Sequence, residues 1–231
     1  MSTYLVINLL IVIVPLIFSF EKNIRFYKKI PSYLFSIIIV STVFITWDSI
    51  ASSRGDWGFN SFHISGIKYF SLPYEEILFF ITVPYSCLFI FETISFYIKE
   101  RTISTKPFLF LVGSLILIIT AVIFYDQFYT STVLLFSASF ILISLLFFRS
   151  ILKSRNYWLT VLITFIPFLI FNFVLTYIPV VVYSDHAIWG LKFITIPVED
   201  FFYSYSMISF WILVYSIKEG RINFGVGFTK H

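Results

Sequence analysis

The sequence predicts an all-α membrane protein: about seven transmembrane helices forming two parallel three-helix repeats joined by a linker helix, with the N-terminus outside and the C-terminus cytoplasmic. Three observations support this prediction: an apolar composition, an eleven-residue stretch that occurs twice, and a one-sided distribution of basic residues. Of the 231 residues, 59% are hydrophobic and only 12% are charged, and the mean hydropathy is +0.94. These values exclude an ordinary soluble domain.

Seven apolar stretches approach the roughly 20 residues that a helix needs to cross a bilayer. In chain order they are expected at residues 4–20, 33–52, 74–97, 108–124, 129–148, 157–179 and 198–217. The first stretch lacks the basic flank and the small-residue cleavage site of a secretory signal. We therefore expect it to be retained as a membrane span.

The connections between these stretches indicate the orientation. Of the 16 basic residues, only Arg54, Lys68 and Lys192 lie on one side of the predicted bundle, and the other 13, including Lys230, lie on the opposite side. Basic residues concentrate in cytoplasmic connections, so the side with the 13 is expected to be cytoplasmic. The basic pI of about 9.0 is thus explained by topology and predicts no nucleic-acid partner.

An internal repeat is visible at an offset of 124 residues (197 − 73). Residues 66–76 read Gly-Ile-Lys-Tyr-Phe-Ser-Leu-Pro-Tyr-Glu-Glu, and residues 190–200 read Gly-Leu-Lys-Phe-Ile-Thr-Ile-Pro-Val-Glu-Asp. The same offset lays the first three stretches over the last three, which predicts repeats at 1–100 and 125–231 and a linker helix at 101–124. An odd number of spans separates corresponding helices, so the two repeats have the same orientation in the membrane.

Each copy of the motif ends in two adjacent acids, in the first turn of the helix that follows a proline. These acids are Glu75 and Glu76 in the first copy, and Glu199 and Asp200 in the second. Acids at this position also complement the helix dipole, and that purely structural interpretation stays open. No basic residue lies within a helical turn downstream, and Asp48 is predicted at a similar depth. Because ionisable groups within membrane segments are costly, a functional acidic cluster is favoured.

Helical geometry predicts which acid of each pair faces the bundle interior. From Glu75 one face continues through Phe79, and from Glu199 one face continues through Tyr203, each with small hydroxylated residues typical of helix contacts. Glu75 and Glu199 are therefore expected to face inward. Glu76 and Asp200, about 100° around the helix, are expected to be supporting or interfacial groups.

Carboxyl groups brought together in an apolar cleft do not all stay ionised, and one persists as the neutral form that a general acid requires. Asp48, or the amide of Asn172 at the corresponding position, could then hold that acid or stabilise a cation. Trp47 could stabilise a cation through its ring face, although tryptophan near a membrane boundary is commonly an anchor. Glu92 is expected to be an interfacial charge, and the loop at residues 54–59 could be a lid over the cluster.

Cofactor sites have no support in the sequence. Cys87 is the only cysteine, no Cys/His cluster with metal-ligand spacing is present, and no glycine-rich nucleotide or dinucleotide motif is found. We therefore expect no cofactor and no metal.

The duplicated Pro-x-Glu-[Glu/Asp] motif, with Trp47-Asp48 upstream and the loop Asp56-Trp57-Gly58-Phe59 between them, resembles the integral-membrane lycopene cyclases in their fused form. The second repeat departs from the first, because Asn172 stands at the position of Asp48 and the Trp-Gly-Phe loop is missing. The resemblance implies a cofactor-independent, proton-initiated isomerisation of lycopene through gamma-carotene to beta-carotene. It also implies a lipophilic carotenoid substrate in the lipid bilayer of the cell membrane and association with other carotenoid enzymes.

The candidate site residues follow from the motif and its surroundings. The candidate catalytic residues are Glu75, Glu76, Glu199, Asp200 and Asp48, and the candidate substrate-binding residues are Trp47, Phe79, Asn172 and Tyr203. Two other classes of protein are considered. A small transporter suits a three-plus-one-plus-three layout of helices, with the acids coupling protons, although the spans hold few polar residues. A retinal-binding receptor needs an intramembrane lysine, which residues 198–217 lack.

Overall fold

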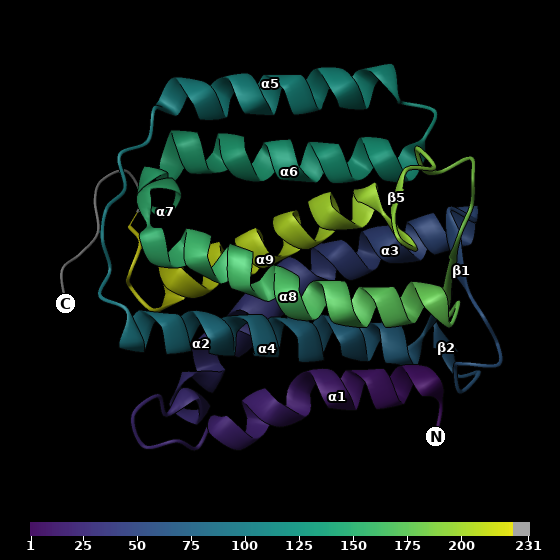
Figure 1. Ribbon diagram of the computed structural model, residues 1–231, viewed down its shortest axis with the longest axis horizontal. Coiled ribbons are helices and arrows are strands. Elements are labelled where there is room, and N and C mark those ends of the chain that lie inside the picture. The colour runs from purple at the N-terminus through teal and green to yellow at the C-terminus, as the bar shows by residue number, and fades with distance from the viewer. Residues whose placement is uncertain (224–231) are drawn as a thin grey trace.

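The structure, a computed structural model, describes residues 1–223. Lys230 and the end of the predicted second repeat lie outside the described residues. The long helices run along one axis of the molecule, and the short strands gather at one end of it (Figure 1). We call the end that carries the strands the strand end, and the other the opposite end.

The described elements follow the chain in a simple order. The helices are α1 (Thr3–Phe18), η1 (Phe26–Lys29), α2 (Ile30–Ser36), η2 (Ile37–Ser41), α3 (Thr42–Arg54), α4 (Tyr74–Tyr97), α5 (Pro107–Ile123), α6 (Phe128–Phe147), α7 (Arg149–Lys153), α8 (Arg155–Tyr177) and α9 (Val198–Lys218). The strands are β1 (Trp57–Phe59), β2 (Lys68–Tyr69), β3 (Leu72–Pro73), β4 (Val181–Tyr183), β5 (Lys192–Phe193) and β6 (Ile196–Pro197).

Each of the seven predicted apolar stretches coincides with a helix or, for residues 33–52, with the continuous run α2, η2 and α3. Within that run η2 is a π-helical turn, a local widening that lets a helix change the direction of its side chains. Four helical segments of the described chain are long and apolar enough to cross a membrane: Phe26–Arg54, Tyr74–Tyr97, Phe128–Phe147 and Arg155–Tyr177. Two shorter apolar helices are Thr3–Phe18 and Pro107–Ile123. The protein is therefore a helical membrane protein.

The short strands recur at the offset seen in the sequence. Adding 124 to the bounds of β1, β2 and β3 gives the bounds of β4, β5 and β6. Strands β2 and β3 form one hairpin, and β5 and β6 form the other, with Lys68 opposite Pro73 and Lys192 opposite Pro197. The two stretches of the repeated motif thus have the same local structure.

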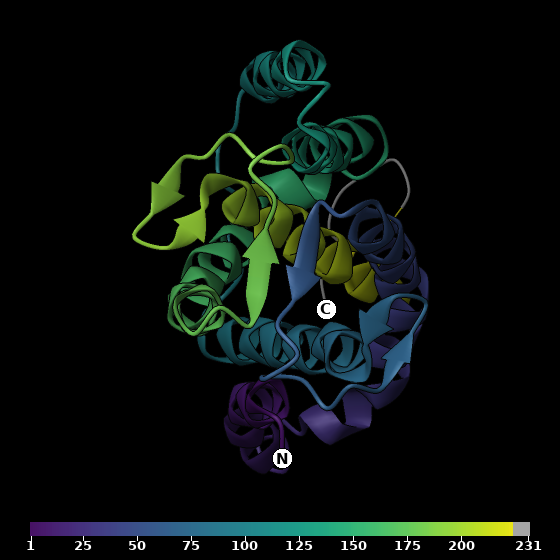
Figure 2. The ribbon, with the colours of Figure 1, turned by 90° about the vertical axis from the view of Figure 1, so that its right-hand side faces the viewer.

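At the strand end β1 pairs with β4 in an antiparallel ribbon (Figure 2). Gly58 faces Val182, and these residues correspond at the offset of 124. Trp57 faces Tyr183, and Phe59 faces Val181. At the offset of 124, Trp57 corresponds to Val181 and Phe59 corresponds to Tyr183, so each of these two pairs corresponds to the other. Such reciprocal pairing is the mark of a local two-fold axis, which passes through the centre of the ribbon.

The glycine that opens each motif is explained by its backbone. Gly66 and Gly190 have φ of 85° and 80°, a left-handed conformation that glycine adopts without steric cost. In the hairpin turns Phe70 and Ile194 also have positive φ, 50° and 60°, which is rare for bulky residues. The chain then enters α4 and α9 through Pro73 and Pro197, whose extended backbone places the acid pair in the first helical turn.

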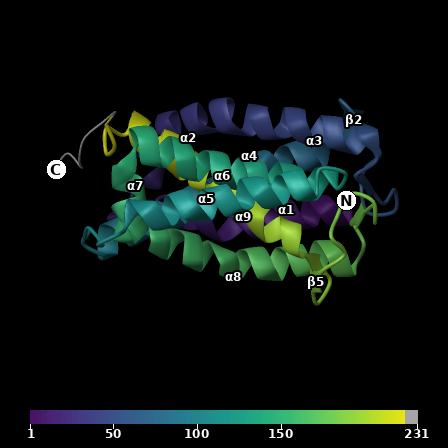
Figure 3. The same ribbon diagram turned by 90° about the horizontal axis from the view of Figure 1, so that it is seen from above.

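Helix α5 lies on the outside of the bundle, beyond α6 (Figures 1 and 2), and only Ser114 and Ala121 of this helix are buried. The main core lies among α2, α3, α4, α6, α8 and α9, with Trp211, Phe80 and Phe140 fully buried. Seen from above, the long helices lie side by side along the molecule (Figure 3). The predicted linker therefore adds little to the interior in which a site could form.

Glu92 differs from the expected interfacial charge. Its residue surface is only 7% exposed, and its Oε1 accepts a hydrogen bond of 2.6 Å from the Tyr215 hydroxyl. Arg221 forms an ion pair with the same oxygen at 2.5 Å. The sequence did not reveal the partner, because Arg221 lies more than a hundred positions downstream.

Candidate active site

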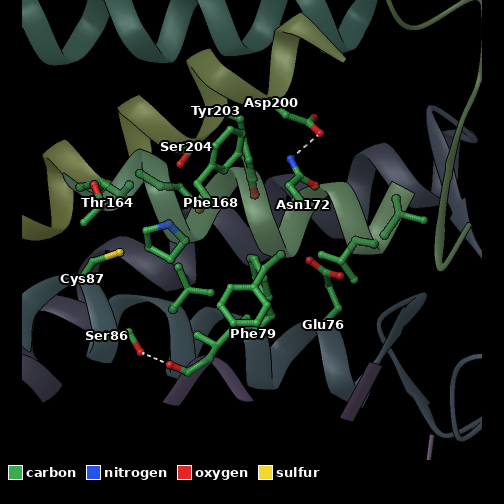
Figure 4. A pocket seen from close by; sticks show the side chains of 18 of the residues that line it. Glu76, Phe79, Ser86, Cys87, Thr164, Phe168, Asn172, Asp200, Tyr203 and Ser204 are labelled. Atoms are coloured by element: carbon green, nitrogen blue, oxygen red, sulfur yellow. Dashed lines mark hydrogen bonds between the residues drawn. The ribbon is translucent and has the colours of Figure 1, made fainter. Parts of the chain in front are cut away.

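A cavity of about 350 Å³ lies inside the bundle. It begins at the β1–β4 ribbon and extends from there toward the opposite end. Helices α1, α4, α8 and α9 form most of its wall, and α3 contributes Asp48. Four polar side chains of the motif and its surroundings line it: Asp48, Glu76, Asn172 and Asp200. Glu76 and Asp200 come from corresponding places in the two repeats and line the cavity from different sides (Figure 4). The local two-fold thus gives one shared cavity.

Helices α3 and α4 contribute two carboxyl groups, Asp48 and Glu76. Glu76 is 8% exposed and Asp48 is 2% exposed, and the two interact electrostatically. The Tyr4 hydroxyl donates to Oε2 of Glu76 at 2.5 Å. Oδ2 of Asp48 is buried and finds no hydrogen-bond partner within residues 1–223. The Trp57 side chain donates a hydrogen bond to Asp48. Two buried carboxyl groups that repel each other cannot both carry a full charge at low cost.

Helix α9 contributes one carboxyl group to the cavity, Asp200, which has three donors. The Tyr129 hydroxyl donates to Oδ1 at 2.5 Å, and Asn172 Nδ2 donates to Oδ2 at 2.8 Å (Figure 4). The Tyr183 hydroxyl lies 3.0 Å from both oxygens. Hydrogen bonds of this kind stabilise the ionised form of a carboxyl group.

Tyr183 belongs to β4, outside the membrane-spanning helices. Burial, together with the neighbouring Asp200 carboxyl, raises the pKa of the Tyr183 hydroxyl well above its usual value. The hydroxyl therefore keeps its proton and acts as a hydrogen-bond donor. The ribbon that joins the repeats thereby also contributes to the acid site.

Glu75 and Glu199 are buried, at 0% and 1% exposure, as expected for side chains that face the bundle interior, but they do not line the cavity. Oε1 of Glu75 accepts hydrogen bonds from the Ser65 backbone N–H at 2.7 Å and from Ser2 Oγ at 2.6 Å. Oε1 of Glu199 accepts hydrogen bonds from the backbone N–H of Trp189 and from Thr130 Oγ1, both at 2.6 Å. Because residues 65 and 189 correspond at the offset of 124, each glutamate binds the start of its own motif to its helix.

Two neighbouring faces of α4 have different roles. The hydroxylated face below Glu75 is a helix contact, as its composition indicates, because Thr82 donates to Asn8 Oδ1 and Ser86 donates to the Ile11 carbonyl of α1. The cavity face begins one residue later. On α4 it continues from Glu76 through Phe79 and Val83, and on α9 from Asp200 through Tyr203 and Met207, which is the i, i+3, i+7 spacing of one helical face.

The candidate substrate-binding residues have different positions. Phe79, Asn172 and Tyr203 line the cavity. Trp47 does not line it, and its ring instead packs against those of Trp57 and Tyr203, with centroids 5.2 and 5.5 Å apart. Trp47 thus packs against two side chains of the cavity wall without lining the cavity itself.

The loop expected as a lid is in part the strand β1, and Trp57 and Phe59 from it line the cavity at the strand end. Aromatic rings also come from the helices: Phe79, Phe168, Phe171 and Tyr203. Faces of such rings attract cations, and the wall is otherwise almost entirely apolar. Within residues 1–223, no group of three or more His, Cys, Asp or Glu side chains is arranged to hold a metal ion.

Sequence reasoning missed the three tyrosines that donate to the acids, Tyr4, Tyr129 and Tyr183. A signal existed for two of them. Tyr4 and Tyr129 stand in the first turns of α1 and α6, and their separation of 125 (129 − 4) is within one residue of the repeat offset. Tyr183 has no such signal, because the corresponding position of the first repeat holds Phe59, which has no hydroxyl.

Comparison with known protein families identifies a match. The family model described as lycopene cyclase matches residues 1–94 and 126–217, which is more than half of the chain. The two matched segments contain the acid pairs and omit α5. No curated protein and no solved structure matches the chain.

Proposed function

The chain belongs to the lycopene cyclase family, and from this premise we propose that it is a lycopene beta-cyclase that converts lycopene to gamma-carotene and beta-carotene. The reaction class is an isomerisation by an intramolecular lyase, without change in oxidation state and without a cofactor. The observation that most supports the proposal is the asymmetric set of buried acids in one apolar, aromatic cavity. The reaction requires this chemistry: a neutral acid, a carboxylate and a wall that tolerates a cation.

We assign the proton donor to the first repeat. Asp48 and Glu76 are buried together and interact, and like charges in such a place share a proton rather than both ionise. The shared proton goes to the terminal double bond of the substrate, which leaves a carbocation on the adjacent carbon. The pair of electrons of a nearby alkene in the same chain then closes the ring and moves the positive charge to a ring carbon.

We assign the carboxylate to the second repeat. Asp200 accepts hydrogen bonds from Tyr129, Asn172 and Tyr183, and these three donors stabilise a negative charge on it. A carboxylate at this position stabilises the cation and then accepts the proton whose loss forms the ring double bond. The proton count is balanced, since one proton is added and one is removed.

The apolar wall protects the intermediate. A carbocation reacts with water, and a cavity lined mainly by aromatic and aliphatic side chains excludes water from the reacting carbon atoms. The faces of Trp57, Phe79 and Tyr203 line the same space as the acids, where they can stabilise positive charge. This composition suits a hydrocarbon better than the hydrophilic cargo of a transporter.

We further propose that the protein crosses the cell membrane several times with the strand end outside. Arg54, Lys68 and Lys192 belong to the strand end, whereas the connections at the opposite end contain most of the basic residues, as expected for cytoplasmic loops. The acids then lie near the outer leaflet. We propose too that the two repeats arose by duplication, with α5 as linker.

Expression of the chain in a bacterium that accumulates lycopene tests the proposal directly. Chromatography of the extracted pigments is expected to show gamma-carotene and beta-carotene in place of lycopene. Glu76→Gln, which keeps the size of the side chain and removes its acid, is the matched negative control. Unchanged lycopene in cells with ample protein in the membrane would refute the cyclase assignment, and a ring of the epsilon type would refute its beta specificity.

A further inference from the structure

The lining of the cavity reaches the surface of the bundle at α1, the helix that contacts α8. Leu10 and Val14 of α1 line the cavity, yet each is 55% exposed. Each of these two side chains thus forms part of the cavity wall and part of the outer surface of the bundle. In a membrane-spanning protein that surface faces lipid, so the interior of the cavity is continuous with the hydrocarbon of the bilayer.

The opening lies away from the acids. Near the strand end α1 and α8 are joined by an apolar cluster that includes Tyr4, Ile7 and Leu175, which closes the wall beside Glu76. Deeper in the bundle the cavity is lined from α1 by Leu10 and Val14, and from α8 by Thr164, Pro167 and Phe168. The acids therefore lie at the strand end of the cavity, which this cluster closes. Leu10 and Val14 lie farther toward the opposite end.

The size of the cavity limits what it can enclose. Its volume of about 350 Å³ is at the lower end of the roughly 300–1,000 Å³ of pockets that bury drug-sized ligands. An extended forty-carbon polyene is comparable in length to the hydrocarbon core, about 30 Å. One end group fits beside the acids, and most of the chain has to extend outside.

We propose that the gap between α1 and α8 is a binding site for the unreacted half of the polyene, which leaves the cavity past Leu10 and Val14 and lies in the bilayer while the other end is held at the acids. The inference rests on the proposed function. The side chains that border the gap are hydrocarbon, as this occupant requires: Leu10, Val14 and Phe168.

Bulky substitutions at the gap test the site, and α1 itself provides matched controls. Leu10→Trp and Val14→Trp narrow the gap. Leu9→Trp and Ile13→Trp add the same ring one residue earlier, at positions that are 44% and 48% exposed and do not line the cavity. Each variant is assayed in membranes with lycopene and with a shortened polyene that keeps the reactive end group and fits within the cavity.

We expect Leu10→Trp and Val14→Trp to slow the conversion of lycopene at least about tenfold, because displacement of the reacting end by the new ring misaligns it with the acids. The shortened polyene should react at the rate of the unaltered protein, and the two controls should leave both substrates unaffected. Equal rates on lycopene for Val14→Trp and Ile13→Trp would overturn the site, as would equal losses on both substrates.

If the tryptophan variants do not accumulate in the membrane, Leu10→Phe and Val14→Phe provide the same comparison with a smaller ring and a smaller expected loss. Failure of the unaltered protein on both substrates would instead refute the proposed function. The failure of the proposed function and the failure of the proposed binding site are therefore distinguishable. The first is seen with the unaltered protein on both substrates, whereas the second is seen in the comparison of the variants.

Discussion

Asn172 donates a hydrogen bond of 2.8 Å to Asp200 at the place where the corresponding residue of the first repeat, Asp48, interacts with the carboxyl group of Glu76. An amide beside a carboxylate needs no shared proton, whereas a carboxyl group beside another does. One difference at corresponding positions thus separates the roles of two otherwise similar acid sites. The local two-fold brings both sites to one cavity, where a donor and an acceptor of protons are needed together.

Asp48→Asn should convert the first repeat to the arrangement of the second. We expect Glu76 to become a hydrogen-bonded carboxylate and the proton donor to be lost, with cyclisation slowed by about 10²- to 10⁴-fold. The measurement is the rate of product formation from lycopene, per amount of protein in the membrane. Thr46→Val is the control, because Thr46 is on the same helix and its hydroxyl donates only to the Thr42 carbonyl. Undiminished turnover in Asp48→Asn would show that Asp48 does not share the proton.

The two acids of each motif should respond differently to the loss of their charge. Glu76→Gln and Asp200→Asn are expected to remove nearly all activity, because both side chains line the cavity. Glu75→Gln and Glu199→Gln should keep most of it, since the amide oxygen of glutamine can still accept the backbone N–H of Ser65 or Trp189. Pigment chromatography with the four variants at matched expression makes the comparison. The reverse order of effects would return the catalytic role to Glu75 and Glu199.

Tyr183→Phe should remove one of the hydrogen bonds that stabilise the Asp200 carboxylate. It keeps the aromatic ring in the cavity wall. The hydroxyl is one of three donors to Asp200, and a hydrogen bond to a charged group is worth roughly 1.5 to 3 kcal/mol. We expect the rate to fall about tenfold or more. Val182→Ala is the matched control, because Val182 is next in the same strand and is 52% exposed. A rate equal to that of the control would mean that Tyr183 does not support Asp200.

Much of the fold could be predicted from the sequence because the bilayer restricts what an apolar stretch of about 20 residues can form. The helices coincide with the seven apolar stretches, and the offset of 124 recurs in the strands. The choice between neighbours such as Glu75 and Glu76 could not be predicted, because both stand in the first turn and the packing of the motif start decides which one turns away. The tyrosine donors were missed because Tyr4 lies 72 positions from Glu76, and sequence patterns within one helix do not report such contacts.

The ion pair of buried Glu92 and partly exposed Arg221 should contribute to stability and not to chemistry, because it lies near the opposite end from the acids. Glu92→Leu leaves the Arg221 guanidinium without its carboxylate, and we expect a loss of about 1 to 3 kcal/mol in the free energy of unfolding, because water reaches the Arg221 side chain. Thermal unfolding in detergent measures the change. In the double variant Glu92→Leu with Arg221→Leu no unpaired charge remains, so it should lose less than the sum of the two single variants. An additive result would mean that the pair is not coupled.

The two ends of one substrate should be cyclised in separate events. Both acid sites line a single cavity of about 350 Å³, and that space accommodates one end group, so the second end has to wait outside. Between the two steps the polyene has to leave and turn, since the acids are at the closed end of the cavity. In a single-turnover experiment, with protein in excess over lycopene and samples stopped over time, gamma-carotene should rise before beta-carotene and then decline. Formation of beta-carotene without a monocyclic intermediate would require two reactive ends within reach of the acids at once, which a cavity of this size does not permit.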